Sequence, residues 1–320
     1  MGPDAGPDSP TQLPGASVWA ALKRTLREFQ ADNLSDWAAA LTYYAVLSIF
    51  PGLLVLVAFL GLLGEKTSKD VQKTITELVP QTDVREIIDR AIDQVANSPT
   101  AGLVAIVGLL GAFWSASSYI GAFMRASNLI YDVPEGRPIW KTLPIRIAVT
   151  AAVGVMLLAS ALIVVFTGKL AEAAGGAIGL GSTAVTVWNI AKWPVLLILV
   201  SLIFAILYWA SPNAKTGGFR WISPGGILAV VVWLIASGAF AVYVANFAKY
   251  NKTYGTLASV IIFLVWLWLT NLAVLLGAEL DAELERSRAI QAGLQPADRE
   301  PYLELRDDTK LKKDDDEDLL

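Results

Sequence analysis

Six long apolar runs divide this sequence, and they restrict its fold more than any other feature. Each run is close to the ~20 residues that a helix needs to cross about 30 Å of hydrocarbon, and charged residues stand mostly between the runs. A helix satisfies its backbone hydrogen bonds internally, as a bilayer requires. The pattern predicts an all-α polytopic membrane protein, a bundle of about six transmembrane helices, with spans near 37–64, 100–124, 144–168, 190–211, 223–248 and 255–280.

The composition argues against several kinds of catalytic and binding site. The chain contains no histidine and no cysteine, which removes the usual general base near neutral pH, thiolate nucleophiles and the commonest zinc ligands. Its net charge is −4, whereas nucleic-acid-binding domains usually carry a concentrated basic face. We therefore expect a protein that is not an enzyme and has no cofactor, no metal site and no nucleic-acid partner.

Polar segments flank and interrupt the spans. Residues 1–15 are rich in Pro, Gly and Asp and are typical of a disordered tail, so the six-helix domain is expected over 16–285. The first outer loop, 65–99, carries two apolar stripes typical of amphipathic helices outside the membrane; they would cap the bundle, lie on the outer leaflet or gate a cavity. The chain then becomes polar, and 286–320 is predicted to be an acidic tail.

A shorter amphipathic segment, 16–30, precedes the first span. Apolar side chains recur along it at helical spacing, and Lys23, Arg24 and Arg27 fill the other side. Such a helix either lies among the headgroups of an anionic leaflet or packs on the protein's own cytoplasmic face. The residues leave both alternatives open.

The orientation in the membrane follows from the basic residues in the loops. With the N-terminus inside, the cytoplasmic segments before the last span hold Lys23, Arg24, Arg27, Arg125, Arg137, Lys141, Arg146, Lys215 and Arg220. The outer segments hold an equal number of basic residues, many of them in loop 65–99. Arg286 and Arg288 follow the last span directly and favour a topology with both termini in the cytoplasm.

Polar residues at membrane depth are candidate sites, because a bilayer makes such groups costly unless they pair or face water. In the first span, Asp36, Tyr43 and Ser48 fall near one stripe beside Tyr44. Pro51 and Gly52 follow, and proline removes a helical hydrogen bond, so a hinge is predicted there. Asp36 alone is more typical of a helix N-cap at the interface, and the tyrosines alone of an aromatic belt, but together with the proline bend these residues predict a lined cavity.

Two further spans add polar candidates. The second span contributes Trp114, Arg125 and Asn128, and the last contributes Asn271 and Glu279. Arg125 could extend to the cytoplasmic headgroups or bind a phosphate or carboxylate. Glu279 and Asp36 flank the same predicted boundary as Arg125, so a salt-bridged cluster is one hypothesis. Its alternative roles are to bind a ligand or to lock helices together.

Several of these stretches resemble the YihY/BrkB family of bacterial inner-membrane proteins, some formerly labelled ribonuclease BN. The matching residues are ALTYYAVLSIFP at 40–51, Arg125-Ala126-Ser127-Asn128 with Tyr131, Ser223-Pro224-Gly225, Tyr254-Gly255-Thr256-Leu257 and Gly277-Ala278-Glu279-Leu280-Asp281-Ala282. The resemblance runs from about residue 20 to 285. It implies a six-helix protein of the bacterial inner membrane without a settled biochemical activity, and links to serum resistance and envelope lipid export.

Three functions remain as hypotheses. The leading one is a transporter or flippase-like protein for an amphiphilic, anionic envelope lipid or lipid-linked precursor, with membrane lipids as partners. The second is a non-transporting scaffold that recruits envelope-biogenesis proteins. The third, a membrane-bound hydrolase or ribonuclease, would need activity from carboxylates alone. The sequence predicts neither the substrate nor the oligomeric state.

Overall fold

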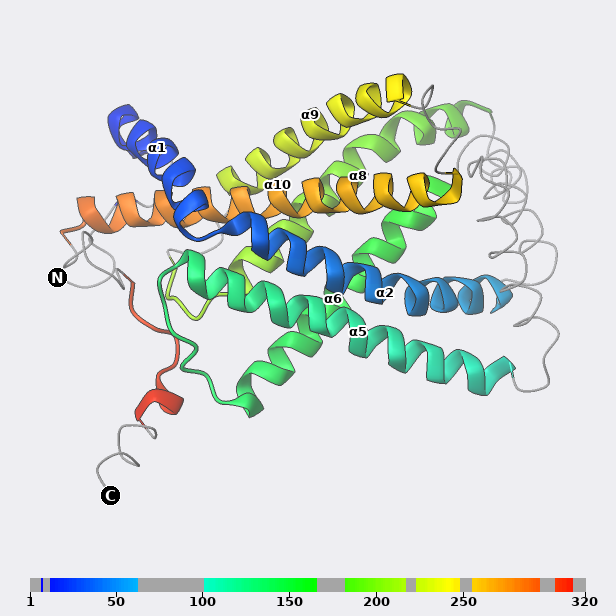
Figure 1. The fold of residues 1–320 in the computed structure, drawn as a ribbon, viewed down its shortest axis with the longest axis horizontal. Helices are drawn as coiled ribbons and strands as arrows, with labels where there is room; N and C mark the ends of the chain where they lie inside the picture. Colours follow the sequence, from blue (N-terminus) through cyan, green and yellow to red (C-terminus); the bar gives the residue numbers. More distant parts are fainter. Residues whose placement is uncertain are drawn as a thin grey trace. The chain divides into compact units, whose positions relative to one another are not determined.

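Helices make up nearly all of the part of the chain that the computed structural model describes, residues 7, 12–62, 101–165, 182–216, 223–247, 255–293 and 303–312. In chain order they are α1 (Gly15–Ala31), α2 (Leu34–Leu62), α5 (Ala101–Ile130), α6 (Ile139–Val165), α8 (Ser182–Ala210), α9 (Ser223–Phe247) and α10 (Gly255–Gln291) (Figure 1). Within these ranges the only β contact is an isolated antiparallel bridge between Ala214 and Leu305. The all-α class is confirmed.

Five of these helices are long and apolar enough to cross a membrane. The stretches lie at Ile106–Ile130, Ile139–Val164, Thr183–Ala210, Pro224–Ala245 and Val260–Gln291. Helix α2 covers most of the first predicted span, and the side chains of 50–62 lie outside the described part. A polytopic membrane protein is confirmed, and the sixth crossing stays a prediction.

The chain divides into two compact units. The first consists of Met1–Tyr44, Ser118–Val149 and Ser201–Leu320, and it contains α1, α9 and α10 in full. The second consists of Ala45–Ser117 and Thr150–Val200. Within the second unit, the Ser48 and Ser115 hydroxyls lie 3.5 Å apart and join α2 to α5.

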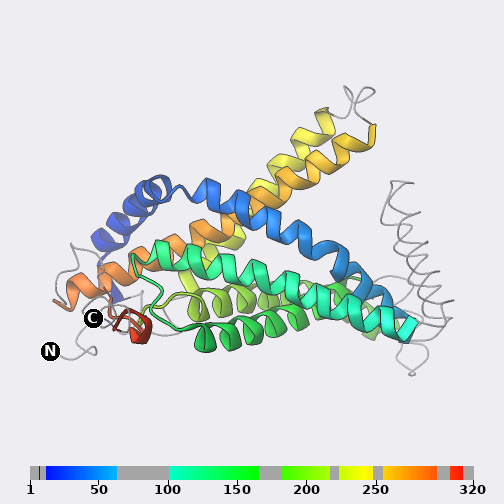
Figure 2. The ribbon, with the colours of Figure 1, turned by 60° about the horizontal axis from the view of Figure 1, so that its bottom comes forward.

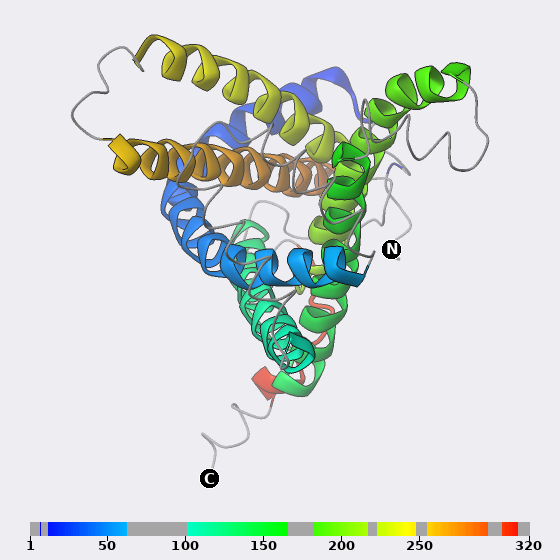
Figure 3. The ribbon, with the colours of Figure 1, turned by 90° about the vertical axis from the view of Figure 1, so that its right-hand side faces the viewer.

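Helices α9 and α10 pack side by side in the first unit (Figures 2 and 3). Two tryptophans of this pair donate from their indole nitrogens across the interface. Trp233 Nε1 donates to Thr270 Oγ1 (3.1 Å), and Trp266 Nε1 donates to Ser237 Oγ (3.2 Å). Each bond satisfies a donor that hydrocarbon would leave unpaired, so the pair is held by polar contacts as well as by apolar packing.

Helix α10 continues beyond the predicted end of the last span at residue 280 and reaches Gln291. The prediction stopped where charged residues begin, but α1 packs against this extension. Leu280 and Leu284 of α10 form a buried cluster with Leu13 and Ala21. Burial of these side chains stabilises a helical extension that its charged sequence alone would not predict.

The structure shows the second alternative for the segment 16–30, packing on the protein itself, along one side of α1. Val18 and Leu22 pack against the α10 cluster, whereas Trp19 and Leu26 remain exposed. The chain then turns into α2 at Asn33, whose φ of 50° lies in the left-handed region that asparagine tolerates better than most residues. One side of α1 is therefore bound to the protein, and contact of the other side with a headgroup layer stays a prediction.

Several sequence predictions concern residues outside the described part. They are the two amphipathic helices of loop 65–99, most of the tail at 1–15 and the acidic run at 314–318. Residues 303–312 belong to the predicted tail but are folded as part of the first unit.

Candidate functional site

A buried series of hydrogen bonds joins α2, α5 and α10 through Asn271. Asn271 Nδ2 donates to Thr42 Oγ1 (3.0 Å), and Tyr119 OH donates to Asn271 Oδ1 (2.9 Å). Thr42 Oγ1 donates in turn to the Ala38 carbonyl of its own helix (2.7 Å). Both ends of the Asn271 amide are therefore engaged, and this candidate residue connects three helices at membrane depth.

Arg125 lies on the exposed side of α5. No ion pair joins it to a carboxylate in the part of the chain that the structure describes, and the hypothetical bridge to Glu279 is not formed. Its charged neighbour is Arg146 of α6, which interacts with it electrostatically. Arg146 Nη2 also donates to Ser118 Oγ of α5 (3.2 Å), and Tyr44 of α2 lies within electrostatic range of the same guanidinium.

The remaining candidates of the first two spans differ in their surroundings. Tyr43 is 61% exposed and meets the Tyr44 ring edge-on, with 5.5 Å between the ring centroids. Trp114 is 69% exposed, and Ser48 faces Ser115 in the second unit. Helix α2 continues through residues 51–52; the hinge predicted there stays a prediction. The structure thus brings Tyr44 near Arg146, with Tyr43 beside Tyr44, while Ser48 and Trp114 belong to the other unit.

Glu279 is 1% exposed on α10, and its Oε2 atom has no hydrogen-bond partner among the described residues. The charged groups that act on it are all acidic, namely Asp32, Glu283, Glu28 and Asp132. Asp36, by contrast, is exposed in the first turn of α2. The predicted boundary cluster of Asp36, Arg125 and Glu279 is therefore not assembled as ion pairs.

Glu283, one turn further along α10, is bound by a basic residue of α1. Arg24 Nε donates to the Glu283 carboxylate, and Arg24 Nη2 donates to Ser287 Oγ (2.7 Å). Arg288 Nη2 similarly donates to Glu285 Oε1 (2.6 Å). These pairs explain how the charged end of α10 is accommodated in a buried setting.

Asn128 anchors a second polar cluster, at the end of α5. Its Oδ1 accepts from the Asn213 backbone N–H (2.7 Å), and its Nδ2 donates to Glu135 Oε2 (2.9 Å). Arg137 holds the same carboxylate through two bonds of 2.7 Å. Burial alone would raise the pKa of Glu135, but the Arg137 and Asn128 hydrogen bonds hold that pKa below its ordinary 4.5.

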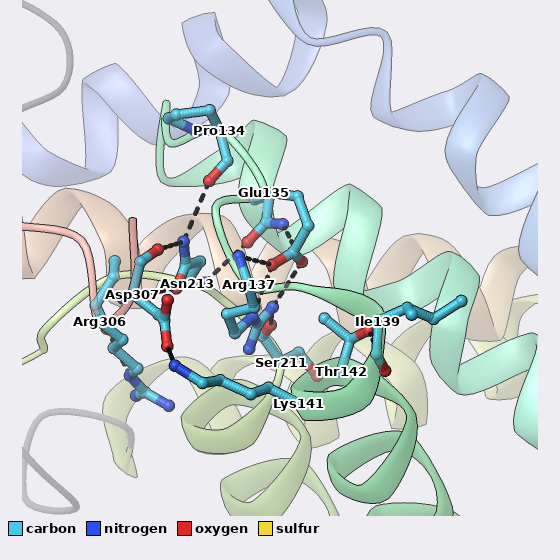
Figure 4. Close-up of polar contacts among 12 residues, drawn as sticks. Pro134, Glu135, Arg137, Ile139, Lys141, Thr142, Ser211, Asn213, Arg306 and Asp307 are labelled. Carbon is cyan, nitrogen blue, oxygen red and sulfur yellow. Dashed lines mark hydrogen bonds and ion pairs between the residues drawn. The ribbon is translucent and has the colours of Figure 1, made fainter. Parts of the chain in front are cut away.

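The C-terminal segment 303–312 completes this cluster, an arrangement that the sequence patterns did not predict. Asn213 Nδ2 donates to the Asp307 carbonyl (2.8 Å) and to the Pro134 carbonyl (3.2 Å) (Figure 4). The Lys215 N–H donates to the Glu304 carbonyl (2.8 Å), which gives the segment a short β-like pairing. No local signal could have shown it, because every partner lies far away in the sequence.

Charged groups reinforce the same contact. Lys141 Nζ of α6 pairs with the Asp307 carboxylate, and this hydrogen bond holds the pKa of Asp307 well below its ordinary 3.8. The Arg306 guanidinium lies over the Trp209 ring, 5.6 Å from its centroid. The cluster therefore ties α5, α6 and α8 to a segment from the end of the chain, a structural rather than a catalytic arrangement.

Comparison with known proteins assigns the chain to a family. A sequence model described as virulence factor BrkB matches residues 25–301. The chain belongs to the virulence factor BrkB family. The ribonuclease-like protein YfkH of Bacillus subtilis is 30% identical over 281 residues, which cover 88% of this chain and 98% of the relative. The resemblance inferred from the sequence motifs is therefore confirmed.

Two further relatives carry no activity in their names. A UPF0761 membrane protein of Chromohalobacter salexigens is 30% identical over 276 residues, 85% of this chain and 65% of the relative. Another, from Alkalilimnicola ehrlichii, is 32% identical over 265 residues, 78% of this chain and 55% of the relative. No solved structure matches the chain. The match ends before segment 303–312, so that contact lies beyond the family region.

Proposed function

We propose that this BrkB-family chain binds an amphiphilic, anionic envelope lipid or lipid-linked precursor and moves it across the bacterial inner membrane. The observation that carries the proposal is the setting of Arg125. It is exposed near the end of the candidate span Ile106–Ile130, and it makes no ion pair within the described residues. A guanidinium at this depth is costly unless it meets water or a counter-charge, and an anionic headgroup supplies that charge.

Other arginines of the first unit differ from Arg125 because they contact carboxylates. Arg24, Arg137 and Arg288 each contact a carboxylate of the chain itself. Their roles are explained by packing and charge neutralisation within the protein. Arg125 has no such explanation, which favours a ligand outside the chain.

The surroundings of Arg125 favour a lipid over a soluble anion. Leu129, one turn further along α5, is 37% exposed, and Leu143 and Ile147 of α6 are also exposed. Apolar side chains left outside a membrane-spanning bundle face acyl chains. A ligand that reaches Arg125 with its headgroup would place its tails along these residues.

The remaining parts of the proposal concern movement and placement. A hinge at Pro51 and Gly52 would allow α2 to change its bend, and loop 65–99 would guide the lipid as it leaves. Both termini would lie in the cytoplasm, which puts Arg125 at the leaflet where lipid precursors are made. The tyrosines Tyr43 and Tyr44 would line the entry.

A reconstitution experiment tests this function. The full chain is placed in vesicles that contain a fluorescent phosphatidylglycerol, and a membrane-impermeant quencher reports how fast the lipid changes leaflet. We expect exchange faster than in protein-free vesicles, a severalfold reduction with Arg125→Gln or Pro51→Ala, and no change with Arg27→Gln, which removes the same charge from α1. Variants that match the unmodified chain would reject the proposal. Absence of exchange with stable co-purification of envelope proteins would instead support the scaffold.

A hydrolytic function is the second candidate, because the Bacillus subtilis relative is named ribonuclease-like. We propose that the chain is not an enzyme. Its carboxylates would have to act without histidine or cysteine, and Glu279 is buried on α10. Purified protein incubated with RNA and divalent metal ions should show no cleavage beyond that of a Glu279→Gln control. Cleavage that Glu279→Gln abolishes would establish the enzyme.

A further inference from the structure

We propose that Arg125 and Arg146 together form a clamp for a terminal phosphate on a membrane lipid. This inference rests on the proposed function and specifies the chemistry of the headgroup. The clamp consists of the two arginines with Ser118 and Tyr44, and it draws on three helices, α2, α5 and α6. All four residues belong to the first compact unit.

The α5 face explains how the two guanidinia come together. Ser118, Gly121 and Arg125 are spaced by three and four residues, so they share one face of the helix. The Arg146 guanidinium lies against that face, since a Cβ built on Gly121 would meet Arg146 Nη1 at 3.1 Å. Its Nη2 donates to Ser118 Oγ at 3.2 Å. Glycine at 121 thus leaves the room that the second arginine occupies.

Charge identifies the kind of ligand. Arg125 is the charged neighbour that acts most strongly on Arg146. Two like charges repel each other, more strongly near a membrane than in water. An anion between them removes this repulsion. Guanidinium groups bind phosphate through paired N–H donors, and the Ser118 and Tyr44 hydroxyls provide further donors.

The number of donors favours a terminal phosphate over a phosphodiester. A terminal phosphate carries about 1.5 to 2 negative charges near neutral pH and presents three acceptor oxygens, whereas a phosphodiester carries one charge. Two arginines and two hydroxyls match a terminal phosphate better than a phosphodiester. The exposed Leu129 and Ile147 lie one turn and one residue from the two arginines, which provides an apolar path for the attached chains.

Lipid binding by the purified full chain tests the clamp. Native mass spectrometry in detergent would follow titration with phosphatidic acid, phosphatidylglycerol and phosphatidylcholine. We expect phosphatidic acid to bind most tightly. Arg125→Gln and Arg146→Gln should each weaken it about tenfold, the effect of losing a charge-assisted hydrogen bond. Arg27→Gln should leave it unchanged.

A pair of glycine variants tests the position of Arg146 separately from its charge. Gly121→Ala places a methyl group against the guanidinium, whereas Gly111→Ala on the same helix meets nothing within 4 Å. We expect Gly121→Ala to bind phosphatidic acid more weakly than the unmodified chain, and Gly111→Ala to bind it equally well. This comparison also serves if Arg146→Gln fails to fold, and equal binding by both variants would argue against the clamp.

The outcomes separate the clamp from the proposed function. Normal binding by Arg146→Gln with weak binding by Arg125→Gln would overturn the clamp and leave the function standing. Intact phosphatidic acid binding by a chain that moves no lipid would overturn the function and leave the clamp. If millimolar inorganic phosphate displaces phosphatidic acid from the chain, the site binds a soluble anion, and the lipid assignment is overturned. Equal affinity for all three lipids would overturn the clamp.

Discussion

Gly225 of α9 and Gly277 of α10 bring two helix backbones into direct contact. A Cβ built on Gly225 would lie 2.1 Å from the Gly277 carbonyl oxygen, and one built on Gly277 would lie 2.5 Å from the Gly225 oxygen. A backbone carbonyl cannot move aside as the end of a long side chain can. Small residues allow such close approach between membrane helices, and here no side chain at all fits. The same contact lets the Gly225 N–H donate to Asp281 Oδ1 at 2.7 Å.

These glycines give a prediction at the scale of the residue. Gly225→Ala or Gly277→Ala should destabilise the full chain by about 1–3 kcal/mol, because the added methyl group forces the helices apart. Thermal unfolding in detergent measures the change. Gly238→Ala in α9 is the matched control, since nothing lies within 4 Å of its added Cβ, and alanine favours a helix by up to about 1 kcal/mol. Equal destabilisation by all three variants would contradict the close contact.

The C-terminal segment 303–312 shows how a short element with only one helical turn, at 309–312, is held. Its backbone pairs with Asn213 and Lys215 after α8, and the Lys310 N–H donates to the Gly136 carbonyl at 2.9 Å. A Cβ on Gly136 would meet the Asp307 carbonyl oxygen at 2.3 Å. The segment thus depends on backbone contacts to two loops as well as on burial of Leu303.

Asn213 is the residue on which this element depends most. Asn213→Ala removes both bonds of its side-chain amide nitrogen and the bond that its Oδ1 accepts from the Asp307 N–H (3.2 Å). Each buried partner left unsatisfied costs about 1–3 kcal/mol, so hydrogen-exchange protection of the Arg306 and Asp307 amides should fall at least about tenfold. Lys215→Ala loses an exposed ion pair with Glu304, worth about 0–1 kcal/mol. This variant should change the hydrogen-exchange protection little. Equal protection in both variants would rule out the anchoring role.

The docking of this element should also depend on pH. The Lys141 hydrogen bond lowers the pKa of Asp307 below 3.8. Burial would raise the pKa of Glu135, but its hydrogen bonds to Arg137 keep that pKa below 4.5. A carboxyl whose folded pKa is depressed stabilises the folded state above its ordinary pKa, and that contribution is lost as the pH falls through the folded value. The segment should therefore stay docked at neutral pH and loosen below about pH 4.

The cysteine-free chain makes this measurable. Spin labels on Trp140→Cys and Lys312→Cys report the distance between α6 and the segment, and we expect a broader distribution as the pH falls. In a Lys141→Gln background, the part of this broadening that depends on Asp307 should disappear. The Asp307 carboxyl then lacks the hydrogen bond that lowers its pKa. A distribution that broadens as the pH rises would contradict the assignment.

At the scale of the whole molecule, the bilayer explains what could be predicted from the sequence. Helix α9, Ser223–Phe247, was predicted within one residue because hydrocarbon demands long apolar helices. The end of α10 was missed because its charges are neutralised by partners such as Arg24 on a distant segment. Arg125 was found from the cost of a charge at membrane depth. Arg146 entered only the count of basic residues, because its proximity to Arg125 depends on how α5 and α6 pack.

The topology of the whole chain is the remaining expectation, and single cysteines can test it in intact cells. An even number of crossings with both ends inside puts Lys312, which is largely exposed, in the cytoplasm. It puts Thr183, at the start of α8 and also exposed, on the outer side. A membrane-impermeant maleimide should then label Thr183→Cys in intact cells and Lys312→Cys only after permeabilisation. Labelling of Lys312→Cys alone would invert the orientation and place Arg125 at the outer leaflet, where it could receive a lipid but not take one from the cytoplasmic side. Labelling of both in intact cells would require an even number of crossings between the two positions, which would contradict α8, α9 and α10 as three separate spans.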